Sequence, residues 1–272
     1  MRAFSSTPKE MILSLYRHHG LIGVLIEREV VGRYRGSFMG ILWSFFNPIF
    51  MLAVYTFVFS VVFKARWNSG SDSKTEFALI LFAGLIMFNL FSECVGKAPS
   101  LILANINYVK KVVFPLEILP WVVLGSALFH TFISVFVWLI VYLALYGLPH
   151  VSVLLLPLII LPLLFFILGL TWALSSLGVY LRDVSQFIGI ILTVLMFLSP
   201  IFYPVEALPE EYRSLLNLNP LTPAIEMARS VMFWGKVPNA FSWGFYLLGS
   251  LVVAWVGFAW FQKTRRGFGD VL

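Results

Sequence analysis

Long apolar runs separated by short polar segments dominate the hydrophobic pattern of the chain. The first run extends from Gly36 to Phe63 without an ionisable residue and is followed by Lys64. About 20 apolar residues rising 1.5 Å each cross a hydrocarbon layer of roughly 30 Å, so this run predicts a membrane-spanning helix with room for tilt or for a distortion at Pro48. The later runs predict five more spans, and the six spans lie at about residues 36–63, 77–95, 121–146, 151–181, 187–203 and 241–262.

Two segments on the N-terminal side of the pattern are mixed rather than apolar. Residues 1–35 carry basic residues among short apolar patches, which favours a helix lying at the membrane surface. A solvated basic tail is the alternative, because the charges do not segregate onto one helical face. Residues 97–115 predict a short helix outside the hydrocarbon, because Pro115 and the following Pro120 interrupt the chain at its end.

The longest polar segment after the N-terminus is residues 205–240, which is still rich in Leu, Met, Phe and Trp. An Asn-Pro pair at Asn219 divides it into two predicted short helices, at about 209–216 and 223–233. Both helices are too short to cross a membrane. Residues 263–272 form a basic tail after the sixth span.

Composition agrees with an all-α integral membrane protein. Hydrophobic residues make up 60% of the chain and charged residues 12%, and the mean hydropathy is +0.91, whereas a soluble domain carries about 25% charge. The net charge of +6 follows the flanks of the apolar runs, which argues against nucleic-acid binding. With six spans, 13 of the 19 lysines and arginines fall on the side of both termini. The positive-inside rule therefore predicts that both termini are cytoplasmic.

Residues for catalysis or metal binding are not grouped in the sequence. The acidic residues are scattered, and the four histidines have no metal-ligand spacing. The Gly-Lys pairs at Gly96 and Gly235 are not followed by Ser or Thr, so neither completes the phosphate-binding loop of an ATPase. Cys94 has no cysteine to pair with and is expected to be a small buried side chain. We therefore expect a chain that is not an enzyme and binds no cofactor or metal.

One histidine and a set of aromatic rings are candidates for function within the spans. His130 lies in the third run, where an ionisable side chain is costly, and a hydrogen bond to a neighbouring helix is its structural explanation. Aromatic residues in the first run form two opposite helical stripes, Trp43, Phe46, Phe50 and Phe57 on one side and Phe45, Tyr55, Phe59 and Phe63 on the other. Periodicity does not choose which stripe, if either, faces a pore.

Three stretches of the sequence carry a family resemblance. They are RYRGSFMGILWSFFNPIFMLAVYTFVFSVVFKARW, VYLRDVSQFIGIILTVLMFLSPIFYP and NPLTPAIEMARSVMFWG. They resemble the membrane-spanning permease subunit of polysaccharide ABC exporters of the O-antigen type, which are related to exporters of teichoic acids and capsules. The resemblance covers nearly the whole chain in the same order.

The resemblance implies partners and a substrate. It implies a homodimer of this chain with two separate ATPase subunits, which bind the ATP and Mg²⁺. It implies a bacterial inner-membrane complex that moves a polyprenyl-diphosphate-linked glycan from cytoplasm to periplasm through a channel between the two permeases. Aromatic rings along such a channel can stack on sugars, much as they stack on bases in single-stranded nucleic acids.

The resemblance also implies roles for particular residues. The implied channel lining is Trp43, Phe46, Phe50, Tyr55, Phe59, Phe197 and Tyr203. The implied contacts to the lipid diphosphate are Arg28, Arg33 and Arg35, for which membrane anchoring is an equal alternative. The implied coupling residues, which dock on the ATPase, are Asn105, Tyr108, Lys110, Lys111, Arg182 and Asp183. The helices of residues 205–240 correspond to external gate helices that dip into the outer leaflet.

Two other functions stay open from the sequence. A permease for teichoic acid, capsule, small lipids or drugs would have the same layout. A membrane-embedded lipid-linked glycosyltransferase belongs to another class, and the scattered acidic residues disfavour it. Copurification with an ATPase would favour export, and glycolipid synthesis by the chain alone would favour the enzyme.

Overall fold

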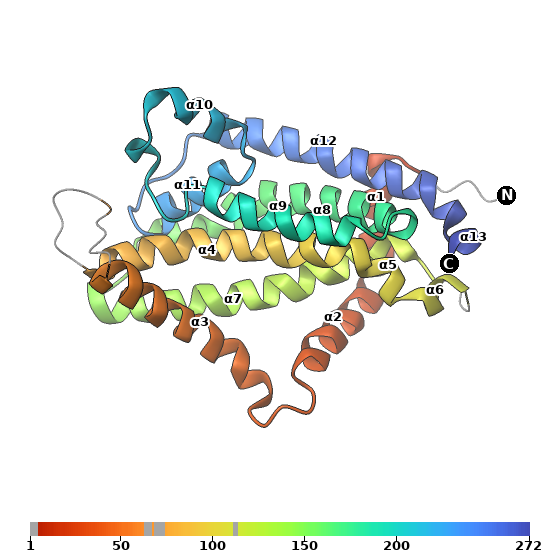
Figure 1. Cartoon of the computed structure of the whole chain (residues 1–272), viewed down its shortest axis with the longest axis horizontal. Helices are drawn as coiled ribbons and strands as arrows, with labels where there is room; N and C mark the ends of the chain where they lie inside the picture. Colours follow the sequence, from red (N-terminus) through yellow and green to blue (C-terminus); the bar gives the residue numbers. More distant parts are fainter. Residues whose placement is uncertain (1–4, 63–66, 68–73, 111–113) are drawn as a thin grey trace.

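The computed structural model describes residues 5–62, 67, 74–110 and 114–272, and these residues form helices and connecting turns without a strand (Figure 1). The α-helices are α1 (Pro8–Arg17), α2 (His19–Tyr34), α3 (Trp43–Tyr55), α4 (Lys74–Lys97), α5 (Leu101–Ala104), α6 (Ile106–Lys110), α7 (Leu119–Tyr146), α8 (Leu156–Tyr180), α9 (Val184–Leu198), α10 (Glu210–Leu218), α11 (Leu221–Met232), α12 (Ala240–Thr264) and α13 (Phe268–Val271). A π-helical segment, Thr56–Val62, continues α3.

Five helical segments of the described residues are long and apolar enough to cross a membrane. They are Gly40–Phe59, Thr75–Ala104, Leu116–Tyr146, Val151–Tyr180 and Ala240–Val271. The prediction of an all-helical chain with several apolar spans is confirmed. The predicted fifth span corresponds to α9, which has 15 residues and rises only about 22 Å at 1.5 Å per residue. The count of six spans therefore stays a prediction.

Helix α4 lies at the centre of the core. Of its most apolar stretch of 18 residues, 83% is buried. Helix α4 lies between α7 on one side and α8 and α9 on the other (Figure 1). The indole Nε1 of Trp138 on α7 donates to the carbonyl of Leu79 on α4 at 2.9 Å. Cys94 on α4 is fully buried. Neighbouring helices surround α4 because its apolar residues occupy all sides rather than one stripe.

Helices α8 and α12 pack closely along most of their length. A Cβ added to Gly257 on α12 would overlap the backbone carbonyl of Gly169 on α8, and a Cβ on Gly169 would overlap the carbonyl of Val253. Small residues at a helix contact let the two backbones approach, which is how apolar helices associate within lipid. This pair forms the side of the bundle opposite α2 and α3 (Figure 1).

A buried arginine joins α11 to α4 and to the segment that follows α9. Arg229 on α11 has no exposed surface, and its Nε donates to the carbonyl of Ile80 at 3.1 Å. Its Nη atoms donate to the carbonyls of Pro200 and Ile201. The guanidinium also lies 4.4 Å from the centre of the Trp67 ring. One side chain therefore fixes α11 against the end of α9.

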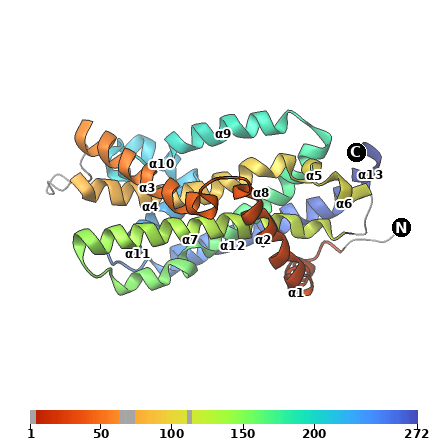
Figure 2. The same cartoon turned by 90° about the horizontal axis from the view of Figure 1, so that it is seen from below.

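The N-terminal segment forms two helices instead of the single predicted surface helix. Thr7 caps α1, because its Oγ1 accepts a hydrogen bond from the backbone N–H of Glu10 at 3.3 Å, and Pro8 occupies the first turn. The chain turns at His18 into α2. Helices α2 and α3 then project from the bundle as a V whose tip is the connection between them (Figure 1). Figure 2, seen from below, shows this connection in front of the bundle.

The short helices gather at the two ends of the bundle. Helices α10 and α11 lie at one end, together with the α7–α8 turn, whereas α5, α6 and α13 lie at the other end (Figure 1). The bounds of α10 and α11 agree closely with the two short helices predicted between the fifth and sixth spans. The predicted coupling segment is divided into α5 and α6.

Candidate functional site

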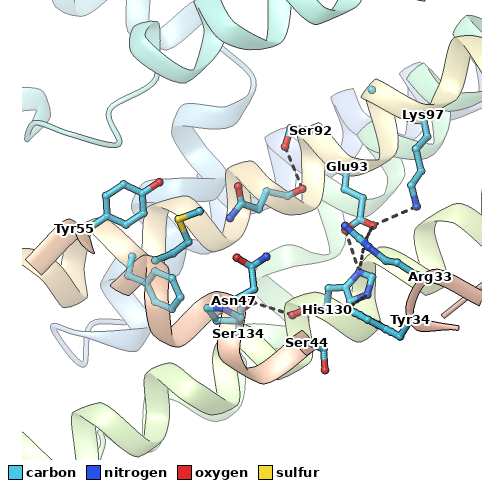
Figure 3. Close-up of a pocket in the computed structure, with 15 residues that line it drawn as sticks. Arg33, Tyr34, Ser44, Asn47, Tyr55, Ser92, Glu93, Lys97, His130 and Ser134 are labelled. Atoms are coloured by element: carbon cyan, nitrogen blue, oxygen red, sulfur yellow. Dashed lines mark hydrogen bonds and ion pairs between the residues drawn. The ribbon is translucent and has the colours of Figure 1, made fainter. Parts of the chain in front are cut away.

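A cavity of about 510 Å³ opens between α2, α3, α4 and α7. Arg33, Glu93 and His130 point toward one another at one end of the cavity, and Tyr55 lies at the other end (Figure 3). Polar side chains cover much of the wall although α3, α4 and α7 are apolar helices. The lining residues are Arg33, Tyr34, Ser44, Asn47, Pro48, Met51, Tyr55, Phe82, Asn89, Ser92, Glu93, Gly96, Lys97, His130 and Ser134.

The carboxylate of Glu93 on α4 is the centre of an ionic cluster. It accepts hydrogen bonds from Arg33 Nη1 at 2.6 Å and from Lys97 Nζ at 3.2 Å. Lys97 also donates to the carboxylate of Glu29 on α2 at 2.9 Å. The Glu93 side chain is 17% exposed, whereas the Arg33 side chain is 48% exposed. The acid is therefore covered, and one of its cations faces the open cavity.

His130 connects α7 to the same cluster. Its Nδ1 lies 3.1 Å from Glu93 Oε2 and 3.1 Å from Arg33 Nη1, and its Nε2 lies 3.2 Å from Tyr34 Oη. Burial raises the pKa of Tyr34 above its usual value of 10.0, so the phenol stays protonated and can donate to the ring. The structural explanation given for His130 from the sequence, a hydrogen bond to neighbouring helices, agrees with these contacts.

The charges of the cluster balance one another. Arg33 and Lys97 contribute two positive charges, and Glu29 and Glu93 contribute two negative charges. Paired charges of this kind can exist at a half-buried position, because each charge has hydrogen-bonded partners. Arg33 and Lys97 are also the donors that a phosphate would use. The site can therefore receive an anion if Glu93 yields part of its hydrogen bonding.

The three arginines predicted to contact a lipid diphosphate are not brought together. Arg33 lines the cavity, whereas Arg28 faces a second, smaller cavity near the start of α5, where its guanidinium lies 6.0 Å from the centre of the Tyr108 ring. Arg35 is exposed at the end of α2. Of these arginines, Arg33 is the one in the ionic cluster.

The aromatic rings of the first span separate into two groups. Trp43, Phe46 and Phe50 lie in a row on the exposed side of α3, with ring centres 6.5 Å and 6.1 Å apart in turn. Tyr55 and Phe59 are half-buried against the core, and their ring centres lie 6.4 Å apart. The periodicity of the sequence separates the two stripes, but it could not show which one is exposed, because both consist of aromatic rings.

At the end of α9, one predicted lining residue is exposed and the other forms a turn. Phe197 is 61% exposed, and its ring stacks on Phe202 at 5.8 Å. Tyr203 Oη donates to the carbonyls of Phe197 and Leu198 at 3.3 Å, so this ring fixes the end of α9. Phe202, which was not among the predicted lining residues, stacks between Phe197 and Phe59.

The predicted coupling residues lie at one end of the bundle. Asn105 Nδ2 donates to Leu101 O at 2.9 Å, and the Tyr108 ring stacks on Phe114 at 4.2 Å. Lys110 Nζ donates to the carbonyl of the last residue, Leu272. Arg182 and Asp183 are exposed in the α8–α9 connection. Lys111 lies outside the described residues.

Sequence reasoning missed most of the polar wall of the cavity. Glu93 was placed at a span end, yet α4 continues past it to Lys97. The i,i+4 spacing of Glu93 and Lys97 at the end of an apolar run is the signal that could have paired them. Asn47 and Asn89 are amides within apolar runs, which is a second signal. Across the described part of the chain, no group of three His, Cys, Asp or Glu side chains could hold a metal ion.

Comparison with known protein families gives a match over most of the chain. The model of the ABC-2 type transporter family matches residues 20–233, which include α2 from its second residue and all helices from α3 to α11, and therefore every helix of the cavity. The chain belongs to the ABC-2 type transporter family. The resemblance to ABC exporter permeases is confirmed by this match.

Several curated relatives of this ABC-2 family chain are similar over nearly its whole length. The O-antigen export system permease protein RfbA of Myxococcus xanthus is 31% identical over 262 residues, which cover 96% of this chain and 98% of the relative. RfbA of Klebsiella pneumoniae is 26% identical and covers 93% of this chain and 95% of the relative. The polysialic acid transport protein KpsM of Escherichia coli is 25% identical, and the match covers 90% of this chain and 93% of the relative.

Proposed function

We propose that this chain is the permease subunit of an ATP-driven ABC exporter that moves a lipid-diphosphate-linked polysaccharide of the O-antigen type out of the cytoplasm. The observation that carries the proposal is the similarity over 96% of the chain to an O-antigen export permease. The capsule polysaccharide export inner-membrane protein CtrC of Neisseria meningitidis is similar at 25% identity, so a capsule polysaccharide is the second candidate substrate. The chain itself acts as a transport subunit and not as an enzyme.

The energy for export comes in this proposal from a separate ATPase subunit. The sequence has no phosphate-binding loop of its own. The docking surface consists of α5, α6 and the Arg182–Asp183 connection, which supply short helices and exposed charged groups at one end of the bundle. The excess of basic residues in the segments on this side supports a cytoplasmic position for that end and for both termini.

Two copies of the chain form the channel in this proposal. Within the first span only 11% of the most apolar stretch of 18 residues is buried. In α9, Ile188 is the one buried residue. Apolar helices exposed on nearly every side can pack against a second copy, and α9 then serves as the short fifth span. The row of Trp43, Phe46 and Phe50 is suited to stack weakly on successive sugars of a moving polymer.

The ionic cavity is the proposed entry site for the lipid diphosphate. Arg33 is half-exposed there and Lys97 pairs with the same carboxylate, so both can reach a phosphate while Glu93 holds them in place. Helices α10 and α11 at the opposite end are the proposed external gate. Export then runs from the cytoplasmic end with α5 and α6 toward the periplasmic end with α10 and α11.

The proposal is tested by deleting the gene in its native bacterium and following the surface polysaccharide. We expect loss of the surface polymer and accumulation of lipid-linked polymer inside the cytoplasm, and rescue by the wild-type chain. Rescue by Arg33→Gln should be poor, whereas Arg266→Gln, at an exposed arginine that does not line the cavity, should rescue fully. Normal surface polysaccharide in the deletion strain would overturn the proposal.

A further inference from the structure

Helix α13 lies beside α6 and the end of α8, at the end of the bundle that carries the proposed docking surface (Figures 1 and 2). Phe268, the first residue of α13, is fully buried. Its ring centre lies 5.6 Å from that of Phe261 on α12 and 6.0 Å from that of Tyr180 on α8. The Phe268 ring therefore anchors α13 to both long helices where they reach this end of the bundle.

The segment before α13 is held to the end of α8. Tyr180 is the last residue of α8, and its Oη donates to the carbonyl of Thr264 at 2.8 Å. The backbone at Gly267 passes so close to this phenol that an added Cβ would lie 2.7 Å from the oxygen. The Arg265 guanidinium also donates to Glu117 Oε2 at 2.6 Å, and both of these side chains are nearly buried. Because a buried ion pair is costly to break, α13 begins at a fixed point next to the α8–α9 connection.

The other end of this segment reaches α6. Leu272 is half-buried against the core, and its carbonyl accepts a hydrogen bond from Lys110 Nζ at the end of α6. Helix α6, whose five residues are all described, has no buried side chain. A helix this short is not stable by itself in water, so the position of α6 depends on the contacts at its ends.

We propose that residues 267–272 form a brace that holds α6 and the α8–α9 connection at a fixed spacing. The inference rests on the proposed function, because these two elements are the proposed docking surface for the ATPase. They come from distant parts of the chain, and the brace contacts α6 through Leu272 and the last residue of α8 through Phe268. A partner that binds both elements at once gains affinity when their spacing is preset, because less freedom is lost on binding.

Phe268 is a positioning residue in this proposal, because its buried ring is out of reach of the ATPase. Its effect on docking must therefore pass through the spacing of the two elements. This spacing can be measured in the permease alone, so the brace can be tested separately from the ATPase.

The first experiment measures this spacing by electron paramagnetic resonance of the full-length chain in nanodiscs. Spin labels are attached through Asn107→Cys on α6 and Gln186→Cys in the first turn of α9, both at exposed positions. Cys94 is fully buried and should not react with the label. Labelled chains are diluted with unlabelled chains, so that each measured distance lies within one chain.

The test variant is Phe268→Ala, and the matched control is Phe91→Ala. Phe91 on α4 is 2% exposed and stacks on Phe166 of α8, so the control removes an equally buried ring elsewhere in the core. We expect a narrow distance distribution in wild type and in Phe91→Ala, and a broader one in Phe268→Ala. Phe268→Leu keeps an apolar side chain and should restore the narrow distribution. Lys110→Met, at an exposed position that leaves the core intact, should also broaden it.

The second measurement is the affinity of the purified ATPase subunit for the same nanodiscs without labels. Phe268→Ala should bind the ATPase about tenfold more weakly than wild type, whereas Phe91→Ala should bind it equally well. An unchanged distance distribution in Phe268→Ala, equal broadening in Phe91→Ala, or unchanged ATPase affinity despite the broadening would each overturn the proposal. Failure of wild type to bind the ATPase would instead overturn the proposed function, and the distance distributions would still decide whether the brace fixes the two elements.

Discussion

The first and second apolar spans have similar hydropathy but opposite environments. In Gly40–Phe59 only 11% of the most apolar stretch of 18 residues is buried, whereas in Thr75–Ala104 the buried share of that stretch is 83%. Helix α4 therefore organises the core of one chain, while α3 exposes Trp43, Phe46 and Phe50 on its outer side. Burial within one chain is thus unrelated to hydropathy here, because lipid or a second copy can cover an apolar helix as well as the chain's own core can.

The two spans also use polar residues differently. Helix α4 carries Glu93 and Lys97 into the ionic cluster and offers the carbonyl of Ile80 to Arg229. Helix α3 contributes Asn47 and Tyr55 to the cavity wall and has no charged residue. The buried helix α4 therefore also positions the charged side chains of the ionic cluster. The exposed helix α3 can instead contact a partner or a polymer.

The largest expected effect comes from removing the buried arginine that joins α11 to α4. Arg229→Met should remove the hydrogen bonds that the guanidinium donates to the carbonyls of Ile80, Pro200 and Ile201, and should destabilise the chain by about 3 kcal/mol or more. Thermal unfolding of the detergent-purified chain measures this loss. The control is Arg266→Met at an exposed position, and equal melting temperatures of the two variants would contradict the role assigned to Arg229.

A matched pair of truncations tests the comparison of the two spans directly. Leu81→Ala, at a fully buried position of α4, should cost about 2 kcal/mol or more because packing contacts are lost. Phe50→Ala, at a position of α3 that is 59% exposed, should change the unfolding temperature little although more atoms are removed. If the α3 truncation destabilises the isolated chain as much as the α4 truncation, the difference between the spans does not hold.

The sequence predicted the helices better than their contacts. The prolines around residues 209, 220 and 223 marked α10 and α11 closely, because proline acts locally on the backbone. The bounds of α7 and α8 followed from apolar runs that end at Gly147 and Leu181. The π-helical segment Thr56–Val62 was not predicted, because no local signal distinguishes it from the α-helix before it.

The candidate site could be predicted only in part, because its members are distant in the chain. Arg33 and Tyr55 were named from the sequence, but the ion pair between Arg33 and Glu93 joins residues 60 positions apart. His130 was recognised as an unusual span residue, whereas its partners on α2 and α4 depend on how three helices pack. A single sequence contains no information that pairs such residues.

At one end of the bundle the core helix α4 leads into α5 and α6. Lys110→Glu should lower the polymer-stimulated ATPase rate several-fold in the purified complex, because a reversed charge at the proposed docking surface opposes association. Lys263→Glu, also at an exposed position, is the control and should keep the wild-type rate. An unchanged rate in Lys110→Glu would remove α6 from the docking surface.

The smallest expected effect concerns the exposed rings of α3 themselves. Phe46→Leu and Phe50→Leu keep an apolar surface but remove the ring faces, so each should slow export about threefold if the rings stack on sugars. Phe46→Tyr and Phe50→Tyr keep the ring and should export at the wild-type rate. Export is measured as surface polymer per minute at equal protein level. If the leucine and tyrosine variants behave alike, α3 offers the polymer no stacking surface, and its exposed side serves contact with lipid or with a second copy.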